Sequence, residues 1–117
     1  MLRFYIKQIE KMREASGYFI GTHDFTSFCS QKSQASSPVR TIFSLEVLQD
    51  EDMITVVIRG DGFLYNMIRI IAGTLIKVGM GVYPPSHILE IMKAKNRKLA
   101  GQTMPAKGLT LVEIEYI

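Results

Sequence analysis

The stretch from Phe63 to Val78 constrains the fold more than any other part of the sequence. Its apolar side chains recur every three or four residues, at Leu64, Met67, Ile68, Ile71, Leu75 and Val78. This spacing predicts a helix that buries one face, ended by Gly79 and Gly81. The most apolar part of the stretch contains Arg69 and is shorter than the about 20 apolar residues that a membrane helix needs. The helix must therefore bury its apolar face inside a folded domain.

Two further helices are predicted, one on each side of this stretch. Residues 3–19 place Phe4, Ile6, Ile9 and Met12 on one side of a helix, which ends at Gly21. Pro84-Pro85-Ser86 is typical of a helix start. The predicted buried side of that helix consists of Ile88, Leu89, Ile91 and Met92. After the first helix, Thr22 or Asp24 is expected to cap a short turn that carries Phe25 and Phe28.

The remaining regular segments alternate like strands. In Val39–Leu48 every second residue forms one set, namely Val39, Thr41, Phe43, Leu45 and Val47, and Met53–Arg59 places Ile54, Val56 and Ile58 on one face. The polar segment between these two predicted strands predicts a hairpin. Leu109–Tyr116 alternates in the same way, and Gln31–Pro38 is predicted to be a loop. The expected order is α-β-β-α-α-β. This order favours an α+β fold, in which an antiparallel or mixed sheet carries helices on one face.

Composition supports one compact domain over residues 1–117. The chain is 47% hydrophobic and 21% charged, which excludes a disordered tail and allows a real core. The single cysteine, Cys29, excludes an internal disulfide and a cysteine-rich zinc site. A free thiol fits a reducing, cytoplasmic setting. His23 and His87 are not spaced as metal ligands, so no metal site is predicted.

A basic cluster follows the last predicted helix. Its members are Lys93, Lys95, Arg97, Lys98 and Lys107, with no acidic residue among them. One interpretation is a solvated helix end, because cations are favourable at a helix C-terminus. The other is a surface that contacts the phosphates of a nucleic acid. The net charge of +3 does not decide between them.

Arg69 is the one charged residue between Phe63 and Ile76. A guanidinium beside an apolar stripe needs an acceptor, because burying it unpaired is costly. It either forms a structural ion pair with Asp24, Asp61 or Glu46, reaches solvent, or serves a functional site. His23 is a weaker candidate, as a general base, and Cys29 lacks a histidine partner that would make it a nucleophile.

Five motifs in register resemble one known family. They are His23-Asp24-Phe25-Thr26-Ser27-Phe28, Arg40-Thr41-Ile42, Gly62-Phe63-Leu64-Tyr65-Asn66-Met67-Ile68-Arg69, Ala72-Gly73-Thr74-Leu75 and Ala106-Lys107-Gly108-Leu109-Thr110-Leu111. Together they resemble the C-terminal half of the bacterial tRNA pseudouridine synthase A family, over about residues 5–116. Proteins of this family convert uridine to pseudouridine in the anticodon stem-loop of tRNA. The resemblance implies half of a pseudouridine synthase fold.

The resemblance also implies roles for individual residues. Arg69 matches the arginine that pairs with the catalytic aspartate, and such a neighbour lowers an aspartate pKa by about 1–3 units. Leu109 matches an apolar residue that lines the uracil pocket, and Phe63 and Leu64 would support the same wall. The target uridine would be flipped out of its stack to enter. The family is homodimeric, binds tRNA and uses no cofactor or metal.

The sequence departs from the family in one respect. The catalytic aspartate of the family lies in a Gly-Arg-Thr-Asp motif, whereas Arg40-Thr41 is followed here by Ile42. The N-terminal half that carries this aspartate is therefore expected to be absent, and the chain is expected to be inactive alone. It is then either part of a longer synthase or a remnant that binds RNA without chemistry. A self-associating structural domain is a third possibility.

Overall fold

The computed structural model describes residues 6–30, 37–51, 53–64, 66–104 and 110–116. Within these residues, α-helices, short 3-10 helices and strands follow one another along the chain. The elements are α1 (Ile9–Gly17), β1 (Gly21–Asp24), η1 (Thr26–Phe28), β2 (Val39–Asp50), β3 (Met53–Gly60), α2 (Met67–Gly79), α3 (His87–Ala94), η2 (Arg97–Leu99) and β4 (Thr110–Tyr116).

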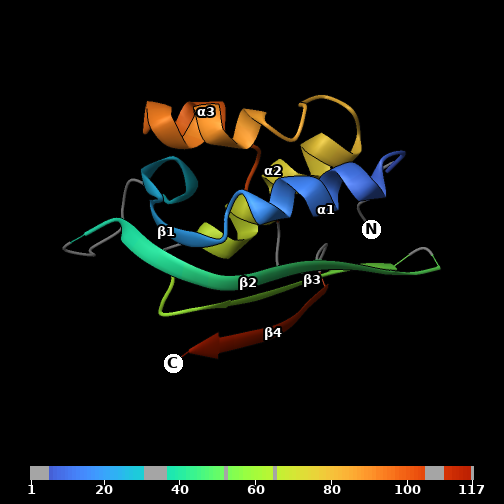
Figure 1. Cartoon of the computed structure of the whole chain (residues 1–117), viewed down its shortest axis with the longest axis horizontal. Helices are drawn as coiled ribbons and strands as arrows, with labels where there is room; N and C mark the ends of the chain where they lie inside the picture. The colour runs from blue at the N-terminus through green and yellow to red at the C-terminus, as the bar shows by residue number, and fades with distance from the viewer. Residues whose placement is uncertain (1–5, 31–36, 52, 65, 105–109, 117) are drawn as a thin grey trace.

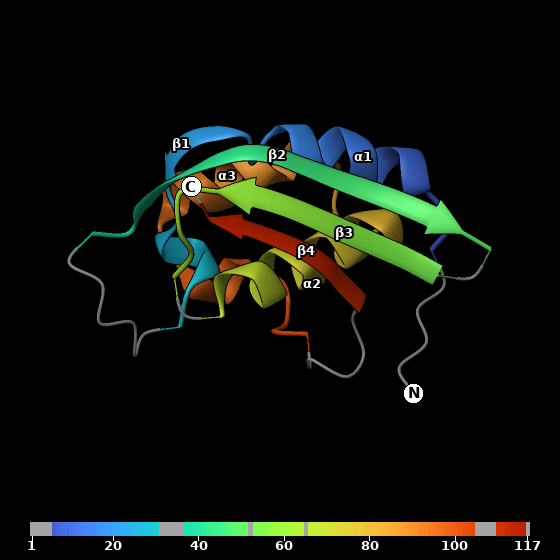
Figure 2. The ribbon, with the colours of Figure 1, turned by 90° about the horizontal axis from the view of Figure 1, so that it is seen from below.

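The strands form one mixed sheet in the order β1-β2-β3-β4. β1 and β3 both run antiparallel to β2, whereas β3 and β4 are parallel. The β2–β3 pair is the predicted hairpin, and its register places Leu45 opposite Ile58 and Val47 opposite Val56. All four of these side chains are buried. Figure 2 shows β2, β3 and β4 side by side with the helices behind them.

The helices all lie on one side of this sheet, which confirms the predicted α+β architecture. Figure 1 shows α1 and α2 against the sheet, with α3 farther from it and above η1. Phe19, Phe25 and Phe28 are fully buried between these layers. The rings of Phe19 and Phe28 meet edge to face, with their centroids 5.1 Å apart. The core therefore fills the space between the sheet and the helices.

The first two helices begin later than the sequence pattern predicts. α1 starts at Ile9 because the backbone of Gln8 is not helical, with a φ of −134° and a ψ of 64°. The backbone amides of Lys7 and Gln8 both donate to the Gly79 carbonyl, at 3.1 Å. α2 starts at Met67 because Asn66 has a φ of 60°, in the left-handed region that a right-handed helix cannot contain. Phe63 and Leu64, predicted to be helical, are therefore outside α2.

One predicted core residue is wrong. Leu89 is 45% exposed, whereas Ile88 and Ile91 are fully buried and Met92 is nearly so. The buried face of α3 follows the spacing i, i+3, i+4 from Ile88, and Leu89 lies about 100° around the helix from that position. Its apolar character alone did not place it on the buried side.

The short strand β1 is absent from the predicted order. The sequence pattern assigned Gly21 to a helix end and Asp24 to a turn. In the structure Gly21 pairs with Ile42 and Asp24 with Val39. This strand forms because it pairs with the edge of β2. Since the residues with which it pairs lie far along the chain, no local pattern in the sequence predicts it.

Candidate functional site

Arg69 lies in the first turn of α2 and is tied to the segment that precedes β4. Its Nε donates to the Met104 carbonyl at 2.6 Å, and its own backbone carbonyl accepts from the Met104 amide at 3.2 Å. Its Nη1 donates to Oδ1 of Asn66 at 3.2 Å. Two neutral oxygens therefore hold a partly buried guanidinium at the N-terminal end of α2.

None of the carboxylates considered as ion-pair partners lies against Arg69 in the described part of the chain. Asp61 accepts a hydrogen bond from the Thr41 amide at 2.9 Å, and Asp24 pairs with Lys95. Glu46 is exposed on β2. The structural interpretation of Arg69 as the partner of one of these three carboxylates is therefore wrong. Its positive charge is available to an acceptor that the described residues do not contain.

Close backbone packing brings Met104 to Arg69. A Cβ added to Gly73 would lie 1.9 Å from the Gln102 carbonyl oxygen, so only glycine allows this approach. The hydroxyl of Thr74 donates to the Ile70 carbonyl and accepts from the Gly101 amide, both at 2.9 Å. Residues 101–104 are thereby fixed against α2, and the guanidinium of Arg69 meets the end of this segment.

The predicted pocket residues have different surroundings. Phe63 is partly buried between β3 and α2, and its ring lies against the backbone of Gly60. Leu64 belongs to the core and is 5% exposed, so it can only support a wall from behind. Leu109 and Lys107 lie outside the described residues. In the sequence, only residues 65–68 lie between Leu64 and Arg69. Phe63 and Leu64 both precede the start of α2.

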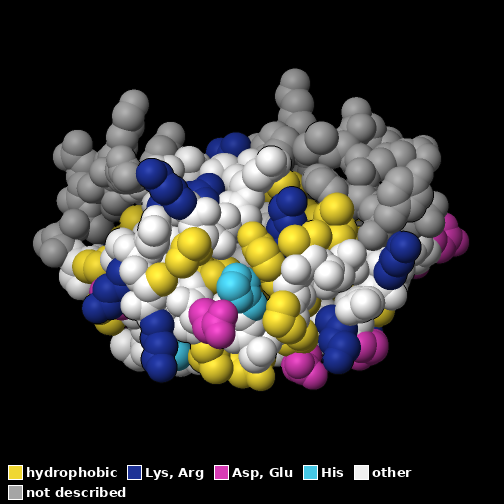
Figure 3. Space-filling view, turned by 90° about the horizontal axis from the view of Figure 1, so that it is seen from above, with side chains coloured by type: hydrophobic (Ala, Val, Ile, Leu, Met, Phe, Trp, Pro, Cys, Tyr) yellow, Lys and Arg dark blue, Asp and Glu magenta, His cyan; other side chains and the backbone are white. Residues whose placement is uncertain are grey.

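The described members of the basic cluster lie at the end of α3 and in η2. Lys93, Lys95 and Lys98 are exposed, and Nη2 of Arg97 donates to the Thr103 hydroxyl at 3.1 Å. Nζ of Lys95 lies 3.8 Å from Oδ2 of Asp24. The cluster thus has an acidic neighbour in space that it lacks in sequence. Figure 3, viewed from the helix side, shows basic side chains spread among hydrophobic ones.

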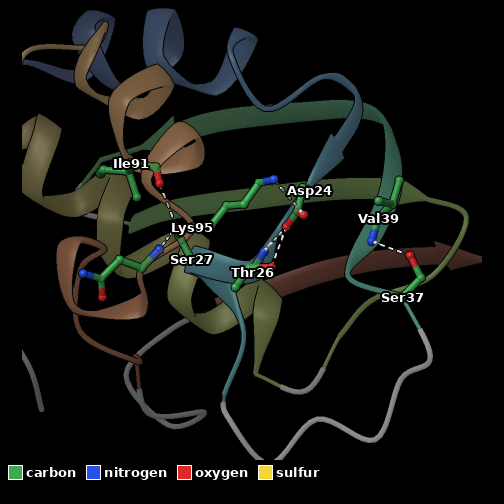
Figure 4. A network of polar contacts seen from close by, with 8 residues as sticks. Asp24, Thr26, Ser27, Ser37, Val39, Ile91 and Lys95 are labelled. Carbon is green, nitrogen blue, oxygen red and sulfur yellow. Dashed lines mark hydrogen bonds and ion pairs between the residues drawn. The ribbon is translucent and has the colours of Figure 1, made fainter.

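Asp24 fastens this cluster to β1, as the close-up in Figure 4 shows. Its Oδ1 accepts from the amide and the hydroxyl of Thr26, at 2.9 and 2.6 Å, although the N-cap position of η1 is Phe25 and not the predicted Thr22 or Asp24. Burial raises the pKa of the Asp24 carboxyl, but the Thr26 hydrogen bonds and Lys95 outweigh it, so the pKa is lower than usual. Asp24 is therefore charged and already engaged.

A second polar contact joins the same elements. Oγ of Ser27, which is fully buried, donates to the Ile91 carbonyl at 2.7 Å and accepts from the Asn96 amide at 2.8 Å. It links η1 to the end of α3, as Figure 4 also shows. Because a buried hydroxyl is costly without partners, these two bonds stabilise the position of the basic cluster.

The other titratable candidates have structural surroundings. Nε2 of His23 lies 2.8 Å from the Ile20 carbonyl oxygen, and its ring meets Phe25 edge to face. Burial, and then the charge of Asp24, raise the pKa of the Cys29 thiol, which makes it a poorer nucleophile. Among the described residues no group of three or more His, Cys, Asp or Glu could hold a metal ion. No helix among them is long and apolar enough to span a bilayer.

Comparison with known proteins decides the family. Residues 15–117 match the profile of the family described as tRNA pseudouridine synthase. The chain belongs to the tRNA pseudouridine synthase family. It is 51% identical over 107 residues to tRNA pseudouridine synthase A of Bacillus pumilus, covering 92% of this chain and 43% of that protein. It is 49% identical over 108 residues to the Brevibacillus brevis protein of the same name, covering 92% and 44%.

The chain spans less than half the length of the curated relatives it matches. The Bacillus cereus tRNA pseudouridine synthase A 1 is 49% identical over 112 residues, which are 96% of this chain and 45% of that protein. The fold described above therefore corresponds to only one part of each of these longer relatives.

The sequence pattern did not predict three residues that lie around Arg69, namely Asn66, Ser30 and Met104. Asn66 fell inside the predicted helix, although asparagine is common at helix starts and tolerates a left-handed backbone, which could have marked it. Ser30 and Met104 are 36 and 35 positions away from the residues they bond. No local sequence signal exists for contacts at such separations.

Proposed function

We propose that this chain is the C-terminal half of a tRNA pseudouridine synthase that isomerises uridine to pseudouridine in the anticodon stem-loop. In this proposal Arg69 meets a catalytic aspartate supplied by the other half. One observation carries it: Arg69 is held by two neutral oxygens, while the described residues leave its charge without a carboxylate. A guanidinium held in this way is prepared to receive one.

The chemical role of Arg69 follows from its charge and geometry. A carboxylate beside a guanidinium stays ionised, because the pair lowers the aspartate pKa by about 1–3 units. The hydrogen bonds from the guanidinium also fix the direction in which the carboxylate attacks the target nucleotide. Pseudouridine has the same composition as uridine, so the conversion is an isomerisation with no net transfer of electrons.

Leu109, Phe63 and Leu64 would form one wall of the uracil pocket. Leu109 would contact the base, with Phe63 beside it and Leu64 supporting the wall from the core. A base that has left its stack needs an apolar surface to replace the lost stacking. The arrangement would thus place the flipped uridine between this wall and the aspartate of the other half.

The first test compares the chain alone with the chain joined to the N-terminal part of the Bacillus pumilus relative. Release of tritium from tRNA labelled at uridine C5 measures the conversion. We expect no release from the chain alone and release from the joined protein. The control is the joined protein with asparagine in place of the aspartate of its Gly-Arg-Thr-Asp motif, which should be inactive. A joined protein that folds and binds tRNA but releases no tritium would point to the RNA-binding alternative.

The basic cluster would contact the phosphates of tRNA. Replacing Lys93 and Lys98 together with glutamine should weaken binding to different tRNAs alike. A plot of the logarithm of the binding constant against the logarithm of the salt concentration should also become less steep. Its slope should decrease by about one for each lost phosphate contact. Binding titrations at several salt concentrations measure both. Lys11 on α1, also an exposed helix lysine, is the control for lost charge. If Lys11→Gln changed tRNA binding and its salt dependence as much, the basic cluster would not be the surface that contacts the phosphates.

The proposal includes the setting in which the enzyme works. The complete protein would be a homodimer in the cytoplasm, where its tRNA substrate is found. Analytical ultracentrifugation of the joined protein measures its oligomeric state directly. A dimer that lacks tRNA affinity would favour the third alternative, a self-associating structural domain.

A further inference from the structure

We propose that Asn66 is a positioning residue that orients the guanidinium of Arg69 so that it receives a carboxylate through its Nη1–Nη2 end. This inference rests on the proposed function, because it assumes that Arg69 meets a catalytic carboxylate. It concerns a different residue and a different property, namely the direction from which the two groups approach each other.

The side chain of Asn66 does not serve its helix. Asn66 precedes α2, where an asparagine commonly accepts a hydrogen bond from a backbone amide in the first turn. The side chain of Asn66 makes no such bond. The backbone carbonyl of Asn66 accepts from the Ile70 amide at 3.0 Å. The amide group is therefore used for something other than capping, and its two bonds show what that is.

Those two bonds fix the direction of the Asn66 amide. Arginine has only donors, so the atom that faces Nη1 of Arg69 at 3.2 Å must be Oδ1. Nδ2 then points to Oγ of Ser30, at 3.1 Å, which can accept. The left-handed backbone of Asn66, with a φ of 60°, turns the side chain toward both partners. Ser30 thus holds an amide that in turn holds Arg69.

The positions of the two acceptors determine which side of Arg69 remains open. A guanidinium has five N–H donors, and here Nε is taken by Met104 and one Nη1 hydrogen by Asn66. A carboxylate can approach a guanidinium from the side, through Nε, or from the end, through Nη1 and Nη2. The Met104 carbonyl occupies the side. Among the described residues nothing takes the second Nη1 hydrogen or the two Nη2 hydrogens, so these three donors are left for a carboxylate.

The decisive variant is Asn66→Gly in the joined protein. Glycine accepts the left-handed backbone, so the variant removes the amide without adding the strain that alanine would add. We expect kcat to fall about tenfold to a hundredfold, because small misplacements of a reacting group have effects of that size. KM for tRNA should change little. The acid limb of the pH–rate profile should move to higher pH, because a poorly placed guanidinium lowers the aspartate pKa less.

A second variant and a double variant separate the possible outcomes. Ser30→Ala removes the hydroxyl that accepts from Nδ2 of Asn66. It should lower kcat less than Asn66→Gly does, and should also move the acid limb of the pH–rate profile to higher pH. Arg69→Ala combined with Asn66→Gly should be no slower than Arg69→Ala alone, because Asn66 acts through Arg69. Additive losses, or an unmoved pH profile in both Asn66→Gly and Ser30→Ala, would overturn the inference. An unchanged kcat in Arg69→Ala would instead overturn the role of Arg69 in the proposed function.

Discussion

Replacing Arg69 with alanine is expected to lower the rate of pseudouridine formation by the joined protein about a hundredfold or more. The catalytic carboxylate would lose both the charge that keeps it ionised and the donors that direct it, and misplacement by about 1 Å has an effect of that size. Tritium release at saturating tRNA measures the loss. Arg69→Lys should restore the charge but little of the rate, because an ammonium lacks the planar pair of donors.

The structure offers a matched control for this variant in Arg13 on α1. Nε of Arg13 donates to the Val47 carbonyl at 3.0 Å, and its Nη1 donates to the Glu10 side chain three residues earlier. Arg69 likewise donates from Nε to a backbone carbonyl and from Nη1 to a side chain three residues earlier, but its side-chain acceptor is the neutral amide of Asn66, whereas Glu10 forms an ion pair with Arg13. Arg13→Ala should therefore lower thermal stability about as much as Arg69→Ala does, with full activity below the melting temperature. Equal activity losses in both variants would show that Arg69 only supports the fold.

Replacing Gly73 with alanine is expected to destabilise the chain by about 3 kcal/mol. In an open helix this change would stabilise by about 1 kcal/mol, so the expected sign is the opposite of helix propensity. The reason is steric: the new Cβ would lie 1.9 Å from the Gln102 carbonyl oxygen, and this obstacle is backbone that cannot rotate away. Unfolding of the chain in urea measures the difference.

Gly17 at the end of α1 is the control for this substitution. A Cβ at Gly17 would meet nothing within 4 Å. Gly17→Ala should leave the free energy of unfolding unchanged or raise it by about 0.4–1 kcal/mol, through the smaller entropy of the unfolded chain. If Gly73→Ala were as harmless as Gly17→Ala, residues 101–104 would not be packed against α2 as described. The two hydrogen bonds between Arg69 and Met104 would then not be held in place by this packing.

Local patterns in the sequence predicted the long elements well. The apolar stripe at Met67, Ile71, Leu75 and Val78 belongs to a helix, because the backbone repeats every 3.6 residues and one side faces the core. The alternation in Val39–Leu48 and Met53–Arg59 predicted the β2–β3 hairpin for the corresponding reason. Both patterns arise from neighbours along the chain, so they can be read without knowing the rest of the fold.

Elements that depend on distant partners were missed or misplaced. β1 forms only because Gly21–Asp24 lies along the free edge of β2. The start of α2 depends on the backbone of Asn66, which is turned toward Ser30 and Arg69. The exposure of Leu89 depends on which side of α3 faces the core. In each case the deciding neighbour is far away in sequence.

The sequence alone determined the α+β class, the helix that carries Arg69 and the resemblance to one family, because periodicity and motifs are local properties. Only the tertiary structure decided what Arg69 touches. The approach of Gln102 to Gly73 brings the Met104 carbonyl to Nε, and Ser30 turns the Asn66 amide toward Nη1. These contacts join segments about 35 residues apart, and the energy of close packing, which no local pattern encodes, sets them.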